Sequence, residues 1–332
     1  MNPSLLSQGP ALARLAPSSA LHLTYAIAPP SQRASPEKRR AIAETQSARI
    51  AELPIDALLV YDVQDETLRN LSPRPFPFSP KVDALSYAYE ELEVRVPRVV
   101  YRAVQGQDET SLVAWMRRVS SLGGRAVFVG APSRNLEARL TLPDAWRLRR
   151  SHVPHLPLGG VVIAERHHGL GTEEARVLAK REQGCEFFVS QTVWSTGAME
   201  ALFRDLLRAH RAETAPGLAF SELPHILVTL SPCGSKQTLD FLEWLGVFVP
   251  PNVRSELLSA RDMLTRSVEL ALEIYGKLRA LAAGLGLSIG WNIESVSTRK
   301  EEVEAAVELL RRIAQREVRA GRGRRAQEVS LA

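Results

Sequence analysis

Two carboxylates lie at the carboxyl ends of predicted strands, where the active residues of a barrel or a parallel sheet are found. Glu165 and Glu294 close the predicted strands 160–165 and 287–294, and ligands bind at the carboxyl ends of such strands. Either residue can serve as a general acid or base, because burial in a closed site raises the pKa of a carboxyl group. The alternative for each is an exposed carboxylate on a loop.

Other side chains at strand ends suit ligand binding. Gln191 ends a short apolar run that follows Gly184, and a buried amide is costly unless it has a partner. We therefore expect Gln191 to contact a ligand. Tyr61, Asp62 and Trp291 follow or end two further strands, and we expect them to contact the substrate.

The remaining strand-end residues suit a cofactor or a pterin-like ligand. They are aromatic, hydroxyl and imidazole side chains and include Tyr101, Ser133 and His168. No metal site is expected, because His168 and its neighbour His167 diverge on a loop and no further ligands lie nearby. The sequence also lacks a Gly-x-Ser-x-Gly elbow and a Ser/His/Asp spacing.

Short β-branched runs alternate with longer amphipathic runs along the chain. The strands and helices that they predict must position the candidate site residues. The predicted strands are 21–28, 56–63, 98–104, 125–130, 160–165, 186–191, 225–230 and 287–294. The predicted helices are 36–52, 108–121, 135–150, 172–183, 197–211, 236–245, 254–283 and 298–316. Eight strands with intervening helices predict an α/β fold, a single-domain (β/α)8 TIM-type barrel. A doubly wound sheet is the alternative, but no strand is followed by a GxGxxG loop.

The chain divides into a lead at 1–20, the barrel at 21–317 and a basic flexible tail at 318–332. A loop rich in proline and phenylalanine, near 62–78, is either a lid over the barrel mouth or a segment packed on the surface. Cys185 and Cys233 lie outside any Cys-x-x-Cys pattern, so we expect reduced thiols in a cytoplasmic protein.

The composition is that of an ordinary globular protein. The 332 residues are 45% hydrophobic and 24% charged, with a net charge of +5. No run of about 18 apolar residues predicts a membrane span, and no secretory signal is evident. The arginines of the tail have no interleaved aromatic residues, so we expect no nucleic-acid partner. The mild positive charge suits a polyanionic small molecule, and a homo-oligomer is left open.

Three segments together resemble the methylenetetrahydrofolate reductase family, a flavin-dependent (β/α)8 barrel of one-carbon metabolism. Residues 180–191 resemble the family's helix, Asp-Ala-Gly-Ala turn and Ile-Thr-Gln strand end. Residues 225–250 resemble its seventh strand, Lys-Gln helix start and Val-x-Ile-Pro ending. Ile27-Ala28-Pro29-Pro30 resembles the Phe-Phe-Pro-Pro that closes the first strand. The resemblance covers about residues 21–315 in patches.

The resemblance implies hydride transfer from NAD(P)H, through FAD or directly, to a folate one-carbon adduct. Gln191 matches the family's folate-binding glutamine. Lys180 matches a lysine near the flavin phosphates, and Glu173 falls where an acidic residue meets the flavin ribose.

Other family positions have changed. The acid that protonates the folate nitrogen is replaced by Ala26, and the Arg-Gly-Asp that contacts flavin appears as Ala131-Pro132-Ser133. The flavin-facing histidine aligns with Tyr101. Three interpretations follow: Glu165 or Glu294 is a displaced acid, the substrate is another pterin or one-carbon compound, or the chain is a non-catalytic folate-binding or regulatory partner protein.

Overall fold

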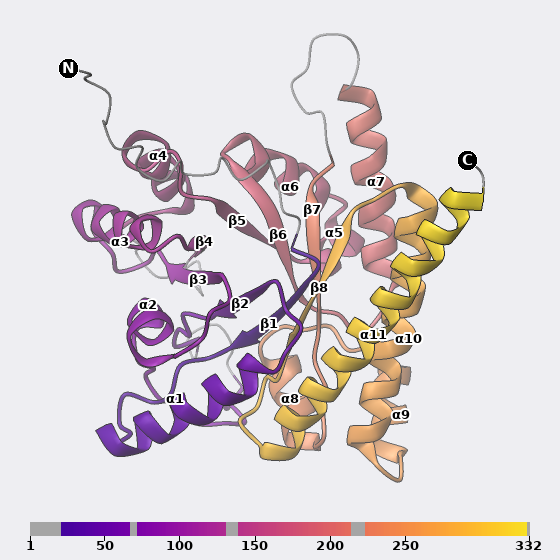
Figure 1. Cartoon of the computed structure of the whole chain (residues 1–332), viewed down its shortest axis with the longest axis horizontal. Helices are drawn as coiled ribbons and strands as arrows, with labels where there is room; N and C mark the ends of the chain where they lie inside the picture. Colours follow the sequence, from indigo (N-terminus) through magenta and orange to yellow (C-terminus); the bar gives the residue numbers. More distant parts are fainter. Residues whose placement is uncertain (1–20, 67–71, 131–138, 214–222, 331–332) are drawn as a thin grey trace, which may run out of the picture.

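Eight parallel strands form a closed barrel in chain order (Figure 1). The computed structural model describes residues 21–66, 72–130, 139–213 and 223–330, apart from the side chains of 168–170, 212–213 and 320–330. The strands are β1 (Leu23–Ile27), β2 (Ala57–Val60), β3 (Arg98–Ala103), β4 (Arg125–Val129), β5 (Leu158–Val162), β6 (Cys185–Thr192), β7 (His225–Leu230) and β8 (Ile289–Glu294). The predicted TIM-type barrel is confirmed.

Helices surround the barrel and alternate with its strands (Figure 1). They are α1 (Pro36–Ala51), α2 (Ala84–Ser86), the π-helical turn η2 (Tyr87–Glu91), α3 (Glu109–Ser121), α4 (Leu142–His152), α5 (Ala164–Leu170), α6 (Glu173–Glu182), α7 (Gly197–Glu213), α8 (Lys236–Trp244), α9 (Pro251–Ser259), α10 (Met263–Leu285) and α11 (Lys300–Ser330). Figure 1 shows α10 and α11 side by side on one flank.

Three of the differences between predicted and observed boundaries are the largest or bear on the candidate site. The single helix expected at 254–283 is two helices, because Asp262 caps a new helix by accepting a hydrogen bond from the backbone N–H of Thr265. Strand β5 ends at Val162, so Glu165 lies in the first turn of α5 rather than on a strand. Helix α11 continues to Ser330, so the boundary expected at 317 falls inside one helix.

Small and large side chains fit together on both faces of β5 and β6, with Phe187 in the barrel interior and Phe188 in the layer under the helices. A Cβ atom on Gly159 would lie 2.5 Å from the ring of Phe187, and one on Gly160 would lie 2.8 Å from the ring of Phe188. These two glycines of β5 therefore make room for the phenylalanines of β6. The interior cluster consists of Leu21, Ala26, Ala57, Leu59, Val99, Tyr101, Val127, Phe187, Val189 and Leu227.

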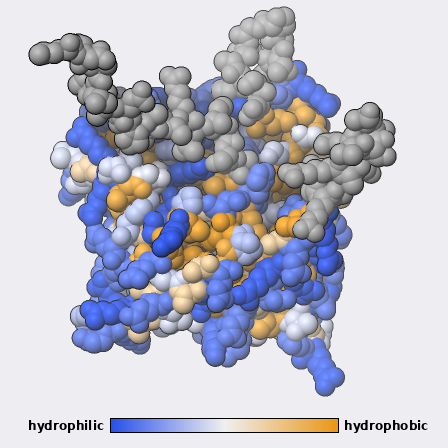
Figure 2. Space-filling model, in the orientation of Figure 1, coloured by the Kyte–Doolittle hydropathy of each residue, from blue (hydrophilic) through white to orange (hydrophobic). Residues whose placement is uncertain are grey.

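A second, larger cluster lies between the strands and the helices, and the helices cover it with polar outer faces. On the face seen in Figure 2, hydrophilic residues cover most of the helical surface, and hydrophobic residues show mainly in the middle. Among the described helices, none is both long and apolar enough to cross a membrane.

Candidate functional site

The carboxylate of Glu294 belongs to the strand next to Ala26, the position where the resembled family has its acid. Ala26 of β1 and Glu294 of β8 are register partners where the barrel closes. Oε2 of Glu294 accepts a hydrogen bond of 2.5 Å from the hydroxyl of Tyr61. Burial raises the pKa of Glu294 to about 7, and the hydrogen bond from Tyr61 partly offsets that rise. A carboxyl group with such a pKa can hold a proton and release it near neutral pH.

Two tyrosines form the wall next to Glu294. The rings of Tyr61, which follows β2, and Tyr101 of β3 meet edge to face, with centroids 4.8 Å apart. Burial raises the pKa of both phenols, so their hydroxyl groups stay protonated. Tyr101 belongs to the barrel interior and is nearly inaccessible, with an exposed fraction of 7%. The structure therefore brings Tyr61, Tyr101 and Glu294 together.

A buried amide joins this group. The Nδ2 atom of Asn292 lies 3.1 Å from the Tyr61 hydroxyl and 3.2 Å from Oγ1 of Thr229, and Thr24 donates to Oδ1 at 3.0 Å. Sequence reasoning assigned no role to Asn292, Thr24 or Thr229. The available signal was the two-residue spacing of Asn292 and Glu294, which places both on the interior face of β8.

Gln191 lies near the carboxyl end of β6 and is half-buried. Its Nε2 atom reaches the backbone oxygen of Leu245, which follows α8, at 3.4 Å. This contact is at the limit of hydrogen-bond length. The amide is thus placed at the mouth with a weak internal partner, which is compatible with the predicted ligand contact.

The loop after β2 crosses to the opposite part of the mouth. Gln32, just past β1, donates its N–H to the backbone oxygen of Pro80 at 2.8 Å. The Phe76 ring meets Phe241 of α8 edge to face at 5.3 Å, and Nε1 of Trp244 donates to the backbone oxygen of Ser72 at 2.8 Å. Since α8 follows β7, this loop spans the region between the ends of β2 and β7, where Glu294 lies. The ring of Phe76 is packed against α8, as expected of a surface-packed segment, and the lid stays a prediction.

The residues predicted to hold a flavin lie around the end of β5. Oε1 of Glu173 accepts a hydrogen bond of 3.0 Å from the N–H of Ile163, and the whole side chain is inaccessible. The ammonium group of Lys180 donates to the backbone oxygen of Val161 at 2.5 Å, and burial lowers its pKa. Both groups are engaged with the protein's own backbone.

This arrangement does not fit FAD. A fully buried Glu173 cannot reach ribose hydroxyls, and Lys180 is turned toward a carbonyl group instead of toward a phosphate. The position of Ser133 lies outside the described residues, as does the side chain of His168. Neither Glu173 nor Lys180 is thus placed as the resemblance implied for a flavin contact.

Glu165 belongs to the same side as Glu173, not to the side of Glu294. Burial raises the pKa of Glu165, and the negative charge of Glu173 adds to that rise. In the closed barrel β5 lies opposite β1. Of the two candidate acids, only Glu294 therefore stands beside Ala26.

Trp291 and Asp62 both have contacts within the protein, and the substrate contact expected of Asp62 stays a prediction. The ring of Trp291 packs on Tyr275 of α10, with centroids 4.7 Å apart. Alternation along β8 turns it away from the interior face that carries Glu294, which corrects the expectation for this residue. Asp62 accepts hydrogen bonds from the N–H of Ala103 at 2.8 Å and from Gln64 at 3.0 Å, so it fastens the loop after β2 to the end of β3.

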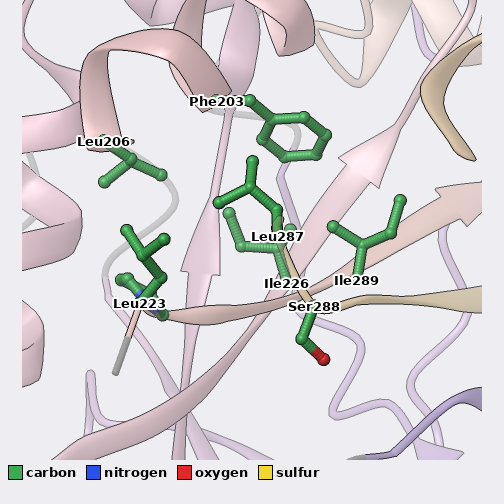
Figure 3. A pocket seen from close by; sticks show the side chains of 8 residues that line it. Phe203, Leu206, Leu223, Ile226, Leu287, Ser288 and Ile289 are labelled. Carbon is green, nitrogen blue, oxygen red and sulfur yellow. The ribbon is translucent and has the colours of Figure 1, made fainter. Parts of the chain in front are cut away.

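Within the part of the chain that the structure describes, neither a metal cluster nor the cavity beside α7 supports a different site. Among the described residues, no group of three His, Cys, Asp or Glu side chains could hold a metal ion. Figure 3 shows an apolar cavity between α7 and the amino-terminal ends of β7 and β8, lined by Phe203, Ile226 and Leu287. Its volume of about 10 Å³ is roughly that of one water molecule, and its walls offer a water few partners.

Among solved structures, the chain resembles a folate-binding protein over nearly its whole length. No protein-family model matches it, and neither does any curated protein. A Clostridium thermocellum protein that binds two copies of 5-methyl-5,6,7,8-tetrahydrofolic acid shares 33% identity with a TM-score of 0.76, covering 89% of this chain and 95% of that chain.

Two other solved structures are similar only distantly. Dihydropteroate synthase of Xanthomonas albilineans shares 16% identity with a TM-score of 0.38, covering 91% of this chain and 94% of that chain. EDTA monooxygenase of Chelativorans shares 14% identity with a TM-score of 0.46, covering 89% of this chain and 94% of that chain. Neither informs the chemistry of this chain.

Proposed function

This chain belongs to the same family as the folate-binding Clostridium thermocellum protein, and from this premise we propose that it binds a reduced folate at the carboxyl ends of its strands. We further propose that it is an atypical oxidoreductase of the methylenetetrahydrofolate reductase type. Its reaction is hydride transfer from NAD(P)H to a folate one-carbon adduct, with Glu294 as the general acid.

The register pair of Ala26 and Glu294 is the observation that carries this proposal. In the reaction, Glu294 gives its proton to the folate nitrogen, and the bond between that nitrogen and the one-carbon unit breaks. The resulting iminium accepts a hydride from NAD(P)H, which yields the methyl group and NAD(P)⁺. With a pKa of about 7, the protonated form of Glu294 is well populated at neutral pH.

We propose direct transfer of the hydride, without a flavin between the two substrates. The buried carboxylate of Glu173 and the carbonyl-bound ammonium of Lys180 support this choice, because both flavin contacts implied by the family resemblance are used internally. Purified protein without flavin absorbance that oxidises NAD(P)H only when methylenetetrahydrofolate is present would agree with it. A yellow protein that requires FAD for turnover would contradict it.

The alternative is a folate-binding or regulatory partner protein without catalysis. Ala26 favours it, since an alanine cannot donate the proton that the family's acid supplies. The deciding experiment combines calorimetric titration with 5-methyltetrahydrofolate and a spectrophotometric assay of NAD(P)H oxidation. Binding with turnover supports the oxidoreductase, binding without turnover under any cofactor condition supports the alternative, and no binding contradicts both.

Replacing Gln191 should weaken folate binding and leave the fold intact. We expect Gln191→Ala to raise the Kd for 5-methyltetrahydrofolate by about tenfold, because the loss of one or two hydrogen bonds costs about 1–2 kcal/mol. The thermal midpoint should stay near that of the parent, as the side chain is half-buried and weakly held.

The matched control is Gln183→Ala. Gln183 precedes β6 at the other end of the same strand, where its amide oxygen accepts a hydrogen bond from Arg150. Its replacement should leave folate affinity unchanged. Equal folate affinities for the parent and Gln191→Ala would show that the amide does not contribute to folate binding.

A further inference from the structure

A chain of hydrogen bonds crosses the barrel interior from β6 to β8 and ends on Glu294. Oγ1 of Thr229 donates to the backbone oxygen of Ser190 at 2.6 Å. The amide of Asn292 links Thr229, at 3.2 Å, to the hydroxyl of Tyr61, at 3.1 Å. Tyr61 in turn donates to Oε2 of Glu294 at 2.5 Å. The middle of this chain is sealed from solvent, since Asn292 has an exposed fraction of 0% and Thr229 of 1%.

The chemistry of the two threonines fixes the orientation of the amide. A hydroxyl group has one hydrogen, and Thr229 gives it to Ser190, so the oxygen of Thr229 faces Asn292 as an acceptor. The atom of Asn292 on that side must therefore be the NH2 group. On the other side, Thr24 donates to Oδ1 at 3.0 Å. A flipped amide would place its oxygen against the oxygen of Thr229 and lose that bond.

This orientation also fixes the hydrogen of Tyr61. The second N–H of Asn292 points at the phenolic oxygen of Tyr61, so that oxygen is an acceptor there. The single phenolic hydrogen is then directed to Oε2 of Glu294. Within the described part of the chain, Oε1 of Glu294 takes part in no hydrogen bond. When Glu294 is neutral, its proton therefore belongs on Oε1.

We propose that Asn292, held by Thr24 and Thr229, is a positioning residue that keeps the Tyr61 hydroxyl as a donor to Oε2 of Glu294 and leaves Oε1 to carry the transferable proton. The inference rests on the proposed function in that Glu294 is taken as the acid. Its geometry can be tested without any folate, because the protonation of Glu294 is measurable in the unliganded protein.

The test is the pKa of Glu294, read from the infrared band of its protonated carboxyl group and assigned by the loss of that band in Glu294→Gln. The described titratable side chains that face Glu294 are Tyr61 and Tyr101, and both keep their protons across this range. The hydrogen bond from Tyr61 lowers the pKa of Glu294. We expect Tyr61→Phe to raise that pKa by about one unit, the size typical of a hydrogen bond to a charged group.

Asn292→Leu should raise the pKa of Glu294, as Tyr61→Phe does. The double variant Tyr61→Phe/Asn292→Leu should raise this pKa no further than Tyr61→Phe alone. Thr24→Val, which keeps the volume and removes one bond to the amide, should give a smaller rise and serves if Asn292→Leu fails to fold. The matched control is Thr192→Val on β6, because the buried hydroxyl of Thr192 bonds to none of the described residues. It should leave the pKa unchanged.

Additive shifts in the double variant would overturn the proposal, since Asn292 would then act on Glu294 independently of Tyr61. No shift in either Asn292→Leu or Thr24→Val would overturn it as well. If these shifts occur while Glu294→Gln retains full turnover, the positioning inference stands and the assignment of Glu294 as the acid fails. If Glu294→Gln is inactive and the shifts are absent, the assignment of Glu294 as the acid stands and the positioning inference fails.

Discussion

Glu294→Gln is expected to lower the rate of NAD(P)H oxidation with methylenetetrahydrofolate by about 10²–10⁴-fold, the usual contribution of a general acid. The amide keeps the size of the side chain and can still accept from Tyr61, so the barrel and the Kd for 5-methyltetrahydrofolate should change little. Stopped-flow and steady-state absorbance assays measure the rate, and calorimetry measures the affinity.

Glu165→Gln is the matched control for this change. Glu165 is also a partly buried carboxylate with a raised pKa, but it belongs to α5 on the other side of the barrel. Its replacement should leave the rate within about threefold of the parent, in line with a residue outside the site. If Glu165→Gln stops turnover and Glu294→Gln does not, the acid has been assigned to the wrong side of the barrel.

The pH dependence of the parent protein follows from the raised pKa of Glu294. A general acid works only while protonated, so kcat/KM should fall as the pH rises through about 7. The same shift affects stability. Because the folded-state pKa is higher than the ordinary value, the stabilisation from this group is present at low pH and is lost as the pH rises toward 7. Glu294→Gln should remove both dependences, which pH-rate profiles and denaturant titrations can measure.

The barrel was predictable because its strands are short, apolar and separated by strong helix signals. β7 has its predicted bounds, since His225–Leu230 is a fully buried run of six residues. The errors lie where a local pattern is ambiguous. The break between α9 and α10 depends on a single capping residue, Asp262, inside an otherwise continuous amphipathic run. The prediction for β5 ran three residues too far, because its apolar run passes directly into α5.

The site was harder to predict because it depends on contacts between distant parts of the chain. The sequence identifies Ala26 as the position of a missing acid and gives Glu165 and Glu294 as replacements. It does not show which one lies beside Ala26. That pairing arises when the barrel closes β8 onto β1, which also joins Thr24 to Asn292 across 268 residues. The contacts of Lys180 and Glu173 were hard to predict for a related reason, since their backbone partners at the end of β5 could not be inferred from residue type.

Moving the carboxylate from β8 to β1 should restore part of the activity that Glu294→Ala removes. The two positions are register partners on adjacent strands, whose backbones lie about 4.8 Å apart. Glu294→Ala vacates space beside Ala26, which is otherwise nearly inaccessible at 2% exposure. We expect the double variant Ala26→Glu/Glu294→Ala to regain at least about tenfold in rate over Glu294→Ala. Recovery should be incomplete, because a displacement of about 1 Å can cost about 10²-fold.

The decisive comparison is with Ala26→Gln/Glu294→Ala, which adds a side chain of the same size without an acidic proton. This control should show no recovery, and steady-state NAD(P)H oxidation at a pH below 7 measures both variants under conditions that protonate a raised carboxyl group. Equal rates for the two double variants, with folate affinity retained in each, would mean that the position of the carboxylate does not limit turnover. A higher rate for the glutamate variant alone would show that one acid can work from either of two neighbouring strands. The absence from β1 of the acid found in the methylenetetrahydrofolate reductase family would then reflect a relocation of the proton donor, with the chemistry preserved by the closure of the barrel.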